Sequence, residues 1–107
     1  SVQTDLGNLS AEERSASLRD IRKGMGLDEA ALKRWDTLDQ ERDARWDKGK
    51  KYMAERTALN DAYSGKELED KLAELRRRMF GDEAEVIAAE EAGGLFRFKL
   101  PRKWGQN

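Results

Sequence analysis

The chain has no cysteine and no histidine, and a single proline among its 107 residues. Without thiols, neither a disulfide nor a thiolate metal site can form. Without histidine and cysteine, the most common general base and the most reactive nucleophile of hydrolytic enzymes are missing. These absences argue against a catalytic triad and against a metal centre with nitrogen or sulfur ligands.

The sequence also lacks the motifs for binding phosphate or for binding a metal ion through oxygen ligands. The sequence contains no glycine-rich phosphate loop and no spacing typical of a calcium-binding loop. Its 22 acidic residues interleave with 21 basic residues at helical spacings, which is typical of a solvated helix surface. We therefore predict that the protein is not an enzyme and that it uses no metal and no cofactor.

Large apolar side chains are scarce. Leu, Ile, Val and Phe together make 19 residues, about 18% of the chain and just below the level at which disorder becomes a concern. The net charge of −1 opposes disorder, which usually needs high net charge as well. No apolar run is long enough to span a membrane. The 40% charged fraction instead favours an all-α fold, an elongated array of about four helices with a thin core.

Residues 10–38 and 64–92 repeat one pattern 54 positions apart. The identical pairs include Ser10 and Ser64, Glu13 and Glu67, Leu18 and Leu72, Arg22 and Arg76, and Met25 and Met79. Conservative pairs such as Leu32 and Val86 extend the match, while the glycines are offset by about one residue. A repeated helix pair indicates a stacked helical array, which is a binding architecture more often than a catalytic one.

Capping signals divide the chain into helices. Ser10 and Ser64 each begin a capping box, and Asp28 and Asp82 are expected to cap the second helix of each copy. The helix after Asp28 is expected to run to residue 63, with Gly49 marking a bend or a break if the helix is interrupted. We thus expect a flexible lead over residues 1–9, an extended helical domain over 10–92, and a basic, aromatic tail over 93–107.

The tail alternates apolar and basic residues, with Phe96, Phe98 and Leu100 on one side and Arg97 and Lys99 between them. This alternation predicts an extended strand, limited by Pro101 to an edge or a partner-bound position. A terminus that folds back on the helices is the other interpretation.

Seven aromatic and arginine side chains on the charged helices are candidate partner contacts, because Trp, Tyr and Arg are enriched at binding hot spots. They are Trp35, Trp46, Tyr52, Arg56, Tyr63, Arg76 and Phe80. Two interpretations remain open: the aromatic residues supply the contacts between helices, or some of them are exposed anchors for a partner.

Nucleic-acid binding is suggested by Arg76, Arg77 and Arg78 and by the basic tail. The pI of about 5.6 opposes it, because nucleic-acid modules are commonly strongly basic. Consecutive arginines on a helix also point in different directions. We expect no nucleic-acid partner.

The motifs over residues 10–92 resemble the extended helical domain of bacterial lipase chaperones, the lipase-specific foldases. The segment from Leu75 to Ala84 follows that family's pattern L-R-x-x-x-F-G-x-E-A, and Trp46, Tyr52 and Arg56 match its connecting helix. The resemblance implies a periplasmic protein, anchored in the inner membrane through a part preceding this chain. It also implies that the helices wrap around a secreted lipase or related hydrolase and assist its folding without ATP.

The chain departs from that family in one important motif. The activation signature R-x-x-F-D-[YF] is not found here, so no activation residue is carried over, and only the binding-helix positions are. The first hypothesis is a helical, lipase-chaperone-like clamp that is monomeric without its client. The alternative is a structural protein or adaptor subunit, whose apolar stripes are buried by self-association.

Overall fold

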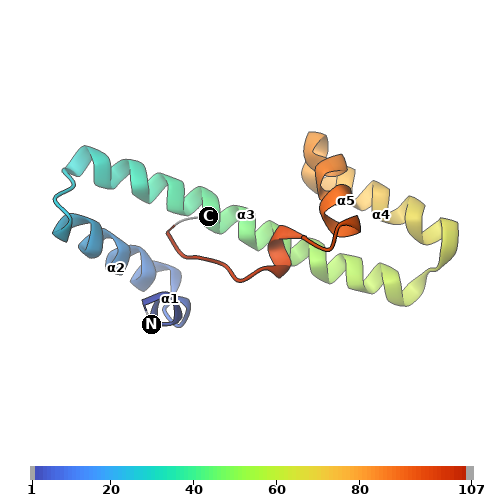
Figure 1. Ribbon diagram of the computed structural model, residues 1–107, viewed down its shortest axis with the longest axis horizontal. Helices are drawn as coiled ribbons and strands as arrows, with labels where there is room; N and C mark the ends of the chain where they lie inside the picture. Colours follow the sequence, from blue (N-terminus) through green and yellow to red (C-terminus); the bar gives the residue numbers. More distant parts are fainter. Residues whose placement is uncertain (1, 106–107) are drawn as a thin grey trace. The chain divides into compact units, whose positions relative to one another are not determined.

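The computed structural model describes residues 2–105, and within them every regular element is a helix. The α-helices are α1 (Val2–Gly7), α2 (Ala11–Gly24), α3 (Glu29–Ala62), α4 (Gly65–Phe80) and α5 (Ala84–Ala92), shown in Figure 1. Two 3-10 turns follow α4 and α5, η1 (Gly81–Glu83) and η2 (Arg97–Lys99). The predicted all-α class is confirmed. Between residues 2 and 105, no helix is both long and apolar enough to cross a membrane.

The start of α2 follows the predicted capping box. The backbone N–H of Glu13 donates to the Ser10 hydroxyl at 3.1 Å, and the Glu13 carboxylate accepts from the Ser10 N–H at 3.1 Å. Hydrogen bonding of the Glu13 carboxylate, first to the Ser10 side chain and second to the Ser10 backbone N–H, lowers the pKa of Glu13. Asp28 caps α3 as expected, accepting from the Ala31 N–H at 2.8 Å.

The second copy begins differently. Ser64 stands at the N-cap of α4, but its side chain makes no capping hydrogen bond. Gly65, the first residue of the helix, has a φ of +59°, which is not helical and so alters the turn that a capping box needs. The predicted cap at Asp82 is also wrong, because η1 occupies this position and Glu83 is the N-cap of α5.

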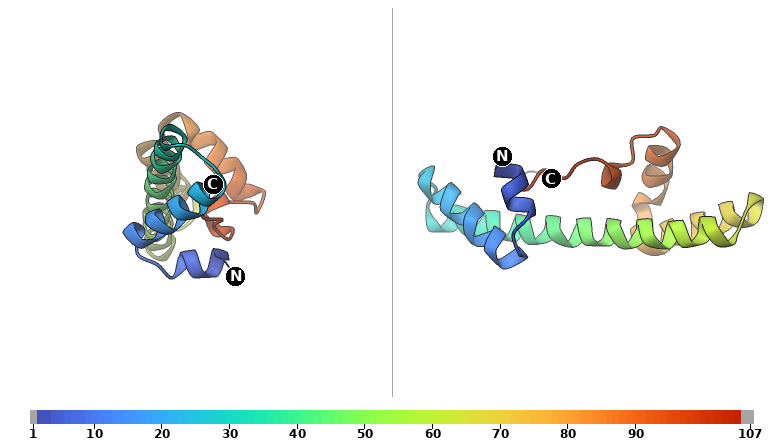
Figure 2. Two further views of the ribbon diagram at one scale, coloured as in Figure 1. Left: turned by 90° about the vertical axis from the view of Figure 1, so that its left-hand side faces the viewer. Right: turned by 90° about the horizontal axis from the view of Figure 1, so that it is seen from below.

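The helix α3 runs through Gly49 without a break for 34 residues. Figures 1 and 2 show it as one continuous helix. A Cβ atom built on Gly49 would lie 2.3 Å from two ring carbons of Phe98. The glycine therefore marks a position where an aromatic ring lies directly on the helix backbone, and neither a bend nor a break.

Both ends of the described chain differ from their predictions. Residues 2–7 form α1 rather than a flexible lead, and the Arg14 guanidinium donates to the carbonyls of Leu6 and Leu9, each at 2.9 Å. Residue 1 of that lead and residues 106–107 of the tail lie outside the described residues. Figure 2 shows α1 next to α2.

The predicted strand over residues 95–100 is wrong. Residues 97–99 form η2, and Phe96 and Phe98 are both buried. The alternative interpretation, a terminus that folds back on the helices, is confirmed for these residues. Two phenylalanines spaced by one residue satisfy a strand pattern, but here a tight turn directs both rings into the same core.

The chain forms two units, one made of residues 1–44 and 102–107 and the other of residues 45–101. We call them unit 1 and unit 2. This division differs from the predicted three segments, because residues 93–107 contribute to both units and the expected 10–92 domain is divided within α3. In unit 1 the buried apolar residues are Leu6, Leu18 and Leu32. In unit 2 they form an aromatic cluster described below.

The two copies of the repeat share some structural roles, with a change of register, although Ile21 is exposed and its counterpart Leu75 is buried. In the first helix the spacing is 54: Leu18 and Leu72 are both buried. After the turn it is 55, because Leu32 and Ile87 are both almost completely buried, whereas Val86, the predicted equivalent of Leu32, is 51% exposed. The extra residue lies in the turn between the helices, in agreement with the offset of the glycines.

Candidate partner-binding surfaces

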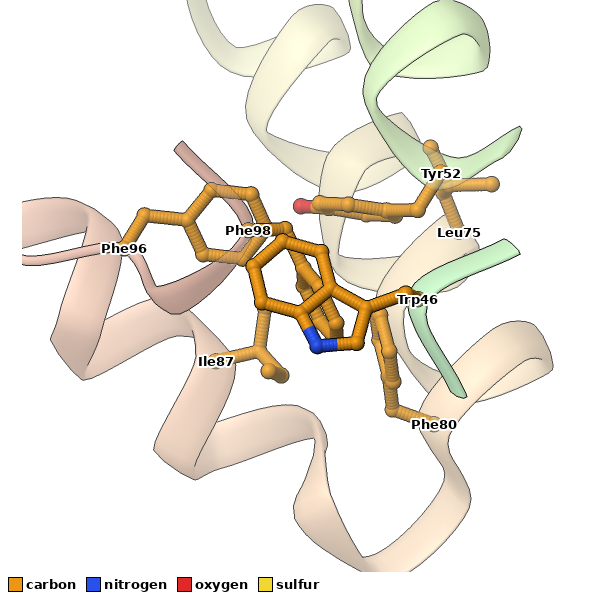
Figure 3. Close-up of a cluster of buried hydrophobic side chains, with 7 residues drawn as sticks. All are labelled: Trp46, Tyr52, Leu75, Phe80, Ile87, Phe96 and Phe98. Atoms are coloured by element: carbon orange, nitrogen blue, oxygen red, sulfur yellow. The ribbon is translucent and has the colours of Figure 1, made fainter. Parts of the chain in front are cut away.

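Three of the seven predicted contact residues lie in the core of unit 2. The core consists of Trp46, Tyr52, Leu75, Phe80, Ile87, Phe96 and Phe98 (Figure 3). The Tyr52 ring meets Phe80 edge to face with centroids 5.0 Å apart, and the Trp46 ring meets Phe98 in the same way at 5.2 Å. Trp46, Tyr52 and Phe80 therefore supply contacts between helices, which is the first of the two interpretations of these residues.

Arg56 and Arg76 converge on one carboxylate, that of Glu91. The Arg56 Nε donates to it at 2.7 Å, the Arg76 Nη2 at 3.0 Å, and the Tyr52 hydroxyl also donates to it. The Glu91 side chain is only 8% exposed. The cluster joins α3, α4 and α5, so both arginines hold unit 2 together.

The protonation of this cluster follows from its contacts. Burial by itself disfavours the charged carboxylate, but hydrogen bonds from Arg76, Tyr52 and Arg56 outweigh it and hold the pKa of Glu91 below its ordinary value. Burial and the bond to Glu91 raise the pKa of Tyr52 to about 12. At neutral pH the site is a neutral phenol and a carboxylate shared by two guanidinium groups, an arrangement that joins α3, α4 and α5.

Glu90 makes a second link. Its carboxylate accepts from the Arg97 backbone N–H at 3.1 Å and from the Arg97 guanidinium. The bond from that guanidinium is the main cause of the lowered pKa of Glu90. This contact fixes the segment that carries Phe96 and Phe98.

The other two predicted residues, Trp35 and Tyr63, are half-buried. The Arg22 guanidinium lies 4.7 Å from the centre of the Trp35 ring, and the Lys71 ammonium 4.6 Å from that of Tyr63. The Arg42 guanidinium lies over the Trp35 ring as well, at 5.6 Å, and both rings still present some surface to solvent. The seven residues are divided between the units: Trp35 belongs to unit 1 and the other six to unit 2.

The sequence did not predict the roles of four residues that make structural contacts. Glu90 and Glu91 look like other acidic residues of a charged helix, and Gly49 looks like a helix breaker. Trp104 was not singled out, yet its ring lies between two guanidinium groups, 3.6 Å from Arg14 and 3.7 Å from Arg102. The position of Trp104 among basic residues of the tail is a sequence signal that could have predicted its contacts with arginine.

Large apolar side chains remain exposed on both units. In unit 1 they are Val2, Ile21, Met25 and Leu38; in unit 2 they are Val86, Leu95 and Leu100. Unit 1 also has a cavity of about 470 Å³ lined by α2, α3 and the segment around Trp104. Unit 2 has a groove of about 350 Å³ between α3 and α4, lined by Leu59, Leu75 and charged residues.

In the part of the chain that the structure describes, no three acidic side chains converge as a metal site would require. The arginines around the unit 1 cavity are engaged: Arg14 with carbonyl groups, Arg19 with Asp36, and Arg102 with Asp43. The unit 1 cavity and the unit 2 groove therefore combine apolar side chains with ion pairs at their edges.

Comparisons of this chain with protein-family models, with curated proteins and with solved structures find no match.

Proposed function

We propose that this chain is a non-enzymatic helical binding protein, a steric chaperone that clasps a secreted lipase-like client and assists its folding or secretion. The observation that carries the proposal is the exposure of large apolar side chains. Of the 19 Leu, Ile, Val and Phe residues, six are exposed: Val2, Ile21, Leu38, Val86, Leu95 and Leu100. Singly exposed apolar residues are common on proteins, but here they make up about a third of the large aliphatic and phenylalanine residues, and we infer that a partner covers them.

The client and the compartment come from the resemblance to lipase-specific foldases over residues 10–92. A protein of that kind works in the periplasm. It stabilises a near-native form of its client because it binds that form more tightly than others. Nothing in this mechanism needs ATP, a metal or a covalent step, in keeping with the residues that the sequence lacks.

Affinity capture tests the proposal. The tagged chain is incubated with periplasmic extract, bound proteins are identified by mass spectrometry, and any captured hydrolase is refolded with and without the chain. We expect a secreted lipase to be enriched and its refolding yield to rise. Matched variants replace three exposed residues of one unit by glutamine, either Ile21, Met25 and Leu38 or Val86, Leu95 and Leu100. At least one variant should lose the client while remaining helical.

Self-association is the second candidate, since the same exposed side chains can be covered by another copy. Sedimentation velocity separates the two functions. A stable oligomer that disappears in the glutamine variants, with no lipase captured, would replace the chaperone proposal by a structural role.

A further inference from the structure

Phe98 occupies a recess in unit 2 that exists because residue 49 has no side chain. Its ring lies directly against the Gly49 backbone, with Trp46 edge-on at 5.2 Å and Phe80 stacked at 6.1 Å. We call this recess, formed by Trp46, Gly49 and Phe80, the Gly49 slot. Glycine costs about 1 kcal/mol relative to alanine inside a helix, so its place in the middle of α3 fits a site of close approach.

The two residues before Phe98 are recognised as well. The Phe96 ring contacts Tyr52 at a centroid distance of 5.7 Å. Arg97, between the two rings, is bound through both its backbone N–H and its guanidinium by Glu90. Three consecutive residues, aromatic, cationic and aromatic, therefore each have a dedicated partner on the helices of unit 2.

Around this triplet the backbone is held to α5 at one further point, where Leu95 N–H donates to Glu90 O at 3.0 Å, while the flanking side chains lie outside the core. Leu95, Lys99 and Leu100 are exposed. Lys99 N–H bonds to Phe96 O and Leu100 N–H to Arg97 O, so these backbone bonds lie within the segment itself. Gly93 and Gly94 precede it, and Gly94 has a φ of +73°. A few buried anchors between exposed neighbours is the pattern of a bound peptide more than that of a core helix.

We propose that the Gly49 slot and Glu90 form a peptide-binding site for a partner protein, specific for an aromatic–cationic–aromatic triplet, and that residues 95–100 occupy it as an internal competitor. The partner's segment displaces Phe96, Arg97 and Phe98 and makes the same contacts. This inference rests on the proposed binding function. The aromatic–cationic–aromatic triplet would be the part of a non-native client that the chain recognises. The chain's own segment demonstrates the required chemistry, including the charge complementarity with Glu90.

The test uses the full chain and a fluorescently labelled peptide with the sequence of residues 93–101. A double variant, Phe96→Ala with Phe98→Ala, vacates the site, and binding is followed by fluorescence anisotropy. We expect this variant to bind the peptide at least about tenfold more tightly than the wild type, whose tethered segment competes at a high effective concentration. A peptide with both phenylalanines replaced by alanine should not bind. Adding Gly49→Ala to the double variant should weaken binding by about tenfold or more.

A second measurement keeps the test decisive if the double variant does not fold. Hydrogen exchange of the wild type is recorded with and without about 5 mM unlabelled peptide, a concentration comparable to that of a short tether. The amides of Lys99 and Leu100 should exchange faster with peptide while α4 stays protected. No change in exchange, or a folded double variant that ignores the peptide, would overturn the inference.

Two other outcomes are informative. Dimers of the wild type that dissociate on adding the peptide would show that the occupant is a second copy's segment, and the partner proposal would fall. If the chain captures a client but does not bind the peptide, only this inference is wrong. If it binds the peptide but captures no client, the Gly49 slot is a binding site and the lipase proposal is wrong.

Discussion

At the scale of single residues, the unsubstituted backbone at Gly49 determines where Phe98 lies. A methyl group there would overlap ring carbons of Phe98 at 2.3 Å, and side chains in a packed core cannot yield by that much. The local sequence signals only a helix interruption at this position. The actual role depends on a residue from the other end of unit 2, so sequence could not reveal it.

Gly49→Ala should destabilise unit 2 by about 1–3 kcal/mol, because expulsion of the Phe98 ring outweighs the better helix propensity of alanine. Denaturant unfolding measures the change. The control is the same substitution in a Phe98→Ala background, where alanine should be neutral or stabilising. Equal effects in both backgrounds would mean that the ring contact is not the cause.

Glu91→Gln should cost about 3 kcal/mol at neutral pH, because Arg56 and Arg76 lose the buried carboxylate that they share. The pKa of Glu91 is lowered in the folded state, so its stabilisation is complete above the unfolded value of about 4.3. It is lost as pH falls through the folded pKa. The stability difference between wild type and variant should therefore shrink in acid.

Glu85→Gln is the matched control for that titration, because Glu85 is an exposed residue of the same helix. It should change stability little at any pH. A difference between wild type and Glu91→Gln that stays constant down to pH 2 would contradict the role assigned to the carboxylate.

At the scale of elements, the helix ends were predictable where the signal is local. The side chains of Ser10 and Asp28 cap their helices by accepting from backbone N–H groups a few residues further on, and Gly26 takes the positive φ expected at a helix end. The segment around Phe96 and Phe98 was not predictable in the same way, because its alternation fits a strand and a buried 3-10 turn equally well. Whether a strand or a turn forms depends on the helices against which the rings pack. The same dependence explains why Ile87, and not the predicted Val86, is the buried counterpart of Leu32.

The helix α1 depends on a residue far along the chain. The Gln3 side-chain N–H donates to the Trp104 carbonyl at 3.1 Å, and the Trp104 N–H donates to the Gln3 side-chain carbonyl at 2.7 Å. The Trp104 indole, between two guanidinium groups, also lies against Gly7. A six-residue helix is too short to be stable by itself, so α1 owes its order to these contacts.

Trp104→Ala should therefore release α1. We expect the amides of residues 2–7 to exchange faster, corresponding to a loss of about 1–2 kcal/mol for the indole and its two cation–π contacts. Hydrogen exchange resolved by residue gives the readout. Leu100→Ala, an exposed side chain a few residues earlier, should leave α1 unchanged; equal effects would show that α1 does not depend on the indole.

At the scale of the whole molecule, the chain is two small units, each with a core of few residues. The shortage of large aliphatic residues predicted a thin core. It did not predict two units, because the boundary after residue 44 lies inside α3, where the composition of the sequence does not change. Of the seven candidate contacts, Trp46, Tyr52 and Phe80 are buried, and the sequence did not predict this because their core is completed by Phe96 and Phe98 from a distant segment.

Leu32→Ala and Ile87→Ala test this division. Both residues are almost completely buried at corresponding positions of the repeat, one in each unit. Each substitution should cost about 2–5 kcal/mol and should accelerate exchange mainly in the helices of its own unit, α2 for Leu32 and α4 and α5 for Ile87. Uniform acceleration over the whole chain would instead indicate a single cooperative core.

The paired bonds between Gln3 and Trp104 join two positions of unit 1 that are 101 residues apart in the sequence. Joining these positions by a short linker would close a loop of about 100 residues, and a cross-link of that length removes unfolded-state entropy equivalent to as much as about 4.7 kcal/mol. The same proximity makes the protein a natural subject for cyclisation and for circular permutation, in which new ends are opened at the turn between α3 and α4.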